Sequence, residues 1–152
     1  MDYIKKTNEI KAKIIELLEN AEIQNLKGIK LRVVDVGLSN NIDTGECPIL
    51  AVYKLIVSGE HIRSDQPSVD VPRMLTINLA LADYSIVSVN EAESLTDDLL
   101  EKILGVLIDN PTLDGFVDKY IVSNITFDEI RDRGVFFSIP EISLEILLKG
   151  VY

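Results

Sequence analysis

Hydrophobic residues recur at helical spacing along the first 21 residues of the chain. Ile10, Ile14 and Leu17 fall on one side of a helical wheel, whereas Glu9 and Lys13 fall on the other and can support the helix as an i, i+4 pair. The pattern predicts an amphipathic helix over residues 1–21. The Lys27-Gly28 pair that follows favours a turn.

Three extended segments are predicted next. Residues 31–38 are rich in valine, residues 49–57 are apolar on both faces, and residues 74–82 alternate between larger apolar and smaller or polar side chains. The second and third segments are separated by Gly59–Arg73, which shows no helical pattern. We therefore expect an antiparallel hairpin with a long loop at its tip.

A second helix is predicted over Leu95–Ile108, where a broad apolar stripe ends before Pro111. Ser94 is the expected N-cap, because Asp97 three residues later completes a capping box.

Two more strands are predicted, over Phe116–Thr126 and Val135–Leu148, with a polar hairpin loop over Asp128–Gly134 between them. Pro140 cannot donate a backbone hydrogen bond, so the last strand should lie at an edge or bend there. The resulting order is α-β-β-β-α-β-β. It predicts an α+β fold with two helices packed on one face of a mostly antiparallel sheet, formed by a single domain of residues 1–152 with a long hairpin loop at 59–73.

Charge and composition narrow the function classes. The chain carries 25 acidic and 15 basic residues, a net charge of −10, and 47% of its residues are hydrophobic. This composition excludes a disordered chain, and the sequence contains no apolar run of about 18 residues that would span a membrane. The acidic excess disfavours specific nucleic-acid binding, most strongly over Asp83–Glu101, where six acids occur without a base.

The sequence offers little catalytic chemistry. Cys47 is the only cysteine and His61 the only histidine, so the usual zinc ligand sets cannot form. A Cys47–His61 dyad is disfavoured, because the strand between them would hold its ends roughly 30 Å apart. No glycine-rich phosphate loop occurs. Asp65 and Asp70 are the best carboxylate candidates, since they share the long loop. We expect no enzyme activity, cofactor or metal.

The order of elements resembles the tail-terminator family, whose members cap the tubes of long-tailed phages and of contractile injection systems. The features that match are an amphipathic N-terminal helix, a hairpin with a long tip, a strand leading to a helix, a short turn phrase, and a closing strand. In this sequence the last four correspond to residues 59–73, 75–81 followed by 97–107, 109–115, and 142–148.

The resemblance implies a six-membered homo-oligomeric ring that ends a tail tube and joins it to a head connector or cap. It implies contacts with tail tube protein and with a sheath or head–tail connector protein, and assembly in the bacterial cytoplasm into a phage or phage-tail-like particle. The residues expected at subunit or tube contacts are His61, Arg63, Asp65, Asp70, Arg73 and Phe136. The acids expected to line the ring's lumen, where they would repel phosphate, are Glu91, Glu93, Asp97 and Asp98.

Two other functions remain open. A small-molecule or peptide binding module would have an apolar pocket between the helices and the sheet. A carboxylate-based hydrolase, less favoured, would use Asp65 or Asp70.

Overall fold

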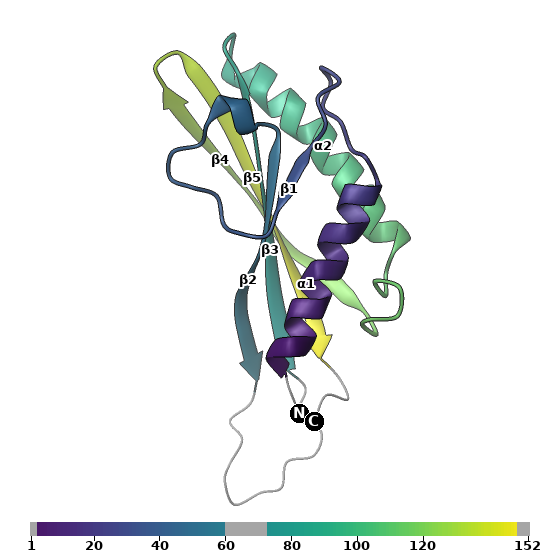
Figure 1. Ribbon diagram of the computed structural model, residues 1–152. Helices are drawn as coiled ribbons and strands as arrows, with labels where there is room; N and C mark the ends of the chain where they lie inside the picture. Colours follow the sequence, from purple (N-terminus) through teal and green to yellow (C-terminus); the bar gives the residue numbers. More distant parts are fainter. Residues whose placement is uncertain (1–2, 60–72, 149–152) are drawn as a thin grey trace, which may run out of the picture.

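The computed structural model describes residues 3–59 and 73–148, and confirms the α+β class and the order of helices and strands (Figure 1). The elements are α1 (Tyr3–Asn20), β1 (Arg32–Val34), the short 3₁₀ helix η1 (Thr44–Glu46), β2 (Ile49–Gly59), β3 (Arg73–Ser85), α2 (Val89–Asp109), β4 (Tyr120–Asp132) and β5 (Val135–Leu148).

The described strands form one five-stranded sheet in the order β1-β2-β3-β5-β4. β1 is parallel to β2, and the other neighbours are antiparallel, including the predicted β2–β3 hairpin. Because the C-terminal strand β5 inserts between β3 and β4, the sheet has β3 and β5 at its centre. Its borders are β4 on one side and β1 with β2 on the other.

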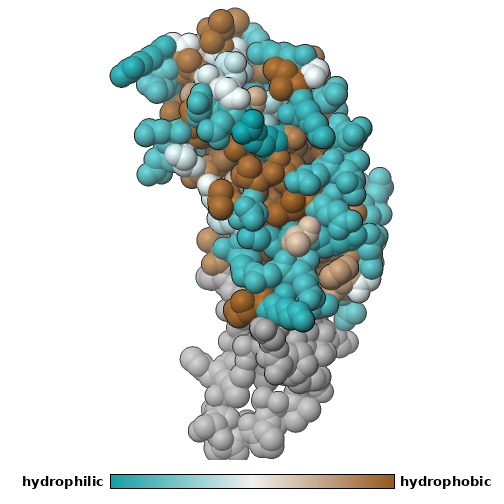
Figure 2. All heavy atoms as spheres, in the orientation of Figure 1, coloured by the Kyte–Doolittle hydropathy of each residue, from teal (hydrophilic) through white to brown (hydrophobic). Residues whose placement is uncertain are grey.

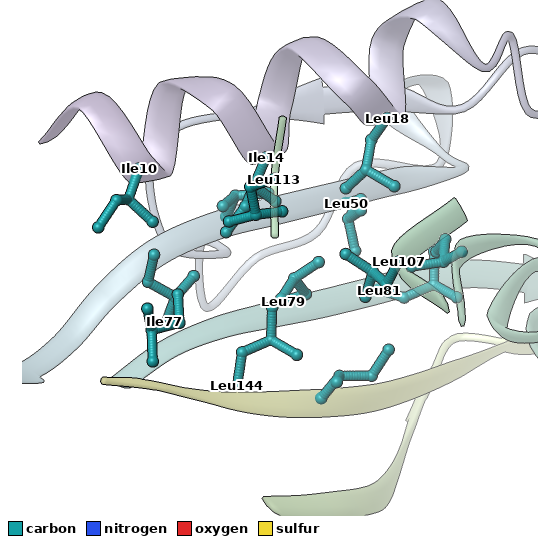
Figure 3. Packing of buried hydrophobic residues seen from close by; sticks show 14 of the residues in the cluster. Ile10, Ile14, Leu18, Leu50, Ile77, Leu79, Leu81, Leu107, Leu113 and Leu144 are labelled. Carbon is teal, nitrogen blue, oxygen red and sulfur yellow. The ribbon is translucent and has the colours of Figure 1, made fainter. Parts of the chain in front are cut away.

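Both helices cover the same face of the sheet. Alternate residues of β3 (75, 77, 79 and 81) and of β5 (142, 144, 146 and 148) are buried in one cluster with residues of α1 and α2 (Figure 3). The helix residues in this cluster include Ile10, Ile14 and Leu18 of α1 and Leu99, Ile103 and Leu107 of α2. Burial of each such side chain stabilises the fold by about 1.5–3 kcal/mol, so this layer defines the arrangement of the sheet and the helices.

The second helix begins earlier than predicted. Ser88 is its N-cap and accepts a hydrogen bond from the Glu91 backbone N–H at 3.1 Å, so the predicted start at Ser94 and the Ser94–Asp97 capping box are wrong. Ser88 and Glu91 have the same capping-box spacing as the predicted pair. The earlier start prevails because it adds Ala92 to the buried face of the helix.

β4 also differs from its prediction, since it runs over Tyr120–Asp132 instead of Phe116–Thr126. The polar segment expected to be a loop is mostly strand, and the turn consists of Arg133 and Gly134 alone, with φ of 50° and 79°. Two residues of positive φ suit the twist of a tight hairpin. β1 is shorter than expected, with three residues.

The prediction for Pro140 is half right. β5 is an inner strand, so Pro140 is not at an edge. However, β3–β5 pairing is interrupted between the pairs Ala80–Glu141 and Asp83–Ser138, which leaves the ladder open where proline lacks an N–H.

Truncation of the central core residue Leu79, which is fully buried, should destabilise the protein by about 2–5 kcal/mol, because Leu79→Ala leaves a cavity under both helices. Urea denaturation measures the change. The matched variant Leu26→Ala, at a leucine that is 62% exposed, should shift stability by less than about 0.5 kcal/mol. Equal losses at the two sites would contradict the described core.

Candidate assembly interface

β4 is a long border strand with one unpaired edge. Twelve of its 13 residues pair with β5 on one side, with a register shift at Ser123, and no strand among residues 3–59 and 73–148 pairs with the other side. Eleven of its residues are exposed, and only Tyr120 and Ile125 are partly buried. A strand with a free row of backbone N–H and C=O groups is ready to pair with another chain.

The side chains of this edge include large hydrophobic ones. Phe127 is 68% exposed and Ile121 is 55% exposed, while Val122 and Ile130 are each 39% exposed. They lie on both faces of the strand, because Phe127 pairs with Pro140 whereas Ile130 pairs with Phe137. We call β4 with these four side chains the β4 edge.

Phe136, the one described aromatic residue among the predicted contacts, lies beside this edge. It is partly buried, and the Arg131 guanidinium of β4 lies over its ring, 5.2 Å from the centroid. Phe137 points to the opposite face, where it is buried beside Tyr84. Phe136 therefore packs against Arg131 at the hairpin end, and its role in a subunit contact stays a prediction.

The other predicted contact residues are not assessed by the structure. His61, Arg63, Asp65 and Asp70 lie outside the described residues, and of Arg73 only the backbone, paired with Leu148, is described. Cys47 is buried, and burial raises the pKa of its thiol to about 12, so the thiol is not nucleophilic near neutral pH.

The four acids predicted to line a lumen differ in their surroundings. Asp98 forms a 2.8 Å ion pair with Lys102, one helical turn away, and Glu91 lies partly buried in the first turn of α2. Glu93 and Asp97 are exposed.

Glu93 lies next to Glu129 of β4. A hydrogen bond with Glu129, then loss of water and the charges of Glu129 and Asp97, raise the pKa of Glu93. Like charges thus meet where α2 passes beside β4. The sequence could not reveal this cluster, because it depends on β5 lying between β3 and β4.

The face of the sheet away from the helices carries a polar cluster that sequence reasoning missed. The Tyr53 hydroxyl and the Asn78 amide each donate to Glu141 Oε1 at 2.5 Å, and Ser143 donates to Asn78 Oδ1 at 2.9 Å. Burial, then the bond with Glu141, raises the pKa of Tyr53. Strand alternation places all four residues on one face, which is the signal that could have identified them.

A second hydrophobic cluster covers the other end of that face, under the segment between β1 and β2. A cavity of about 150 Å³ lies there, lined mainly by Val34, Val36, Leu38, Ile42 and Ile49. A pocket between the helices and the sheet was expected of a binding module. This cavity instead lies on the opposite face, at the β1 border.

No group of three or more histidine, cysteine or acidic side chains among the described residues is arranged to hold a metal ion. None of the helices in the described ranges is both long and apolar enough to cross a bilayer. No protein-family model matches the chain, and a search of curated proteins finds no match.

The buried carboxyl of Asp83 gives a pH-dependent prediction. Burial raises its pKa above the usual 3.8, although bonds from the Tyr84 N–H and the Asn25 amide and the charge of Lys27 oppose the shift. The folded chain therefore binds this proton more tightly than the unfolded chain, and its contribution to stability is lost as pH rises through the folded pKa. As the pH is raised from 4 to 7, the free energy of unfolding of Asp83→Asn should therefore increase relative to that of the wild type.

Chemical denaturation at the two pH values measures this difference. Asp128→Asn, at an exposed residue of β4, is the control for loss of one negative charge. The same relative gain in both variants would contradict a specific effect of burial at Asp83.

Proposed function

We propose that the chain is a structural subunit that assembles with copies of itself into a ring, and that this ring acts as a tail terminator. In this role it ends a tail tube in a phage or phage-tail-like particle and joins the tube to a head connector, sheath protein or cap. The observation that carries the proposal is the β4 edge, a 13-residue strand whose outer side has no partner strand among the described residues and whose Phe127 is 68% exposed.

The physical basis is the free-energy cost of leaving the unpaired backbone groups and hydrophobic side chains of β4 exposed to water. Soluble proteins usually shorten, charge or cover their border strands. β4 is charged mainly toward its hairpin end, at Asp128, Glu129, Arg131 and Asp132, while hydrophobic side chains occur along its length. Pairing with a neighbouring subunit would satisfy the backbone groups and bury the hydrophobic side chains together.

Native mass spectrometry of the purified chain tests the proposal. A closed ring should appear as one assembly of about six times the 17.0 kDa chain, either alone or after mixing with tail tube subunits. A monomer under both conditions, over the micromolar range, would contradict it.

Phe127→Lys should weaken assembly by tenfold or more, since losing the burial of one large apolar side chain costs about 1.5–3 kcal/mol. The folded monomer should keep its stability, because this side chain is 68% exposed. Leu26, on the loop between α1 and β1, is 62% exposed. Leu26→Lys is therefore the matched control and should assemble like the wild type. Equal assembly by the two variants would exclude the β4 edge as the contact.

A further inference from the structure

The sheet has a second unpaired edge on its opposite border. β1 pairs only with Ile49–Ala51, the first three residues of β2. From Val52 to Gly59 no strand within the described residues pairs with the outer side of β2, which runs along the border of the sheet in Figure 1. Within residues 3–59 and 73–148 the sheet therefore has unpaired strand edges on both of its borders.

The border formed by β1 and β2 exposes hydrophobic side chains. Two lysines beside it form hydrogen bonds that join neighbouring segments. Leu55 of β2 is 55% exposed, Val36 is 62% exposed, and Ile4 of α1 is 60% exposed. Figure 2 shows hydrophobic residues gathered between α1 and the segment after β1, bordered by hydrophilic ones. Lys54 of β2 bonds to Asn8 of α1 at 2.5 Å, and Lys11 of α1 bonds to the Asp35 carbonyl at 3.1 Å. We call these residues the β2 edge.

The β4 border is much the more acidic of the two. Residues 32–59, which form β1, β2 and the segment between them, contain two basic and three acidic side chains, and Lys11 of α1 lies beside them, bonded to the Asp35 carbonyl. α2 and β4 together contain nine acidic and two basic ones. The contact between Glu93 and Glu129 concentrates negative charge where α2 meets the β4 edge, and an approaching cation would relieve it.

We propose that the β4 edge of one copy binds the β2 edge of the next, so that the sheet continues from subunit to subunit. This inference rests on the proposed self-assembly and names its contact. Phe127 and Leu55 supply apolar contact near the join, while Lys11 and Lys54 lie on the side that meets the acidic border. The contact is heterologous, so it can close into a ring in which the free edge of β4 and that of β2 from Val52 to Gly59 are paired.

The competing arrangement, in which two β4 edges pair with each other, is less favourable for two reasons. It brings Asp128, Glu129 and Asp132 of two copies together, and it leaves both β2 edges unpaired.

Cross-linking of engineered cysteines distinguishes these arrangements. Leu55→Cys and Phe127→Cys are made singly and together and treated with a short bis-maleimide under assembly conditions. Within one copy the two positions are three strand spacings apart across the sheet, about 14 Å, and the strand registers offset them by a further several residues along it, so a short linker cannot join them. The native Cys47 is buried, and treatment of the wild type measures any cross-linking through this cysteine.

The heterologous contact predicts a ladder of cross-linked species from the double variant and no dimer from either single variant. A mixture of the two single variants should give a dimer containing one chain of each. Leu26→Cys combined with Phe127→Cys is the matched control and should give no ladder.

Dimers from Phe127→Cys alone would overturn the inference in favour of β4–β4 pairing. A ring seen by native mass spectrometry without a ladder would also overturn it, while leaving the proposed ring intact. A monomer with no cross-links in any variant would instead refute the proposed function itself, so the two failures are distinguishable.

Discussion

The structure depends on the burial of one face of the β3–β5 pair beneath two helices. The alternate residues of these two strands are nearly all fully buried, and they contact α1 and α2 in one continuous cluster (Figure 3). This layer requires β5, the last strand in the chain, to lie beside β3. Because β5 occupies that central place, β4 lies at the border of the sheet, where most of its side chains are exposed.

The proposed β4 contact follows from that placement, and the proposed β2 contact follows from the shortness of β1. The helices cover one face of the sheet, and within the described residues both of its borders keep unpaired backbone groups. The N-terminal part of the chain, which is net basic, flanks one border, and the acidic α2 and β4 form the other. The same packing that makes the subunit stable therefore gives it two different edges, which is the requirement for a contact that propagates in one direction.

Much of the fold could be predicted because burial leaves a period in the sequence. Leu75 to Leu81 and Ile142 to Leu148 alternate in the expected way, and those residues form the core. The start of α2 was not predictable from its cap, because Ser88 and Ser94 each begin a capping-box pattern and only tertiary burial selects between them. The polar half of β4 has no buried face, so its sequence shows no hydrophobic period and predicts a loop.

The residues of the proposed assembly contact were only partly predictable for a related reason. The acidic character of residues 83–101 is evident in the sequence, but the approach of Glu93 to Glu129 depends on strand order. The free edge of β2 likewise depends on the shortness of β1, because the predicted eight residues, in the same register, would have reached Leu55 and covered half of it.

Hydrogen exchange of the assembled protein against the dilute monomer tests the central claim most directly. The account predicts that outward-facing amides of β4 and of β2 from Val52 to Gly59 exchange rapidly in the monomer and become protected together on assembly. Amides of the central strand β3 should change little. Protection that appears on β4 alone, or elsewhere with both edges unchanged, would contradict the account.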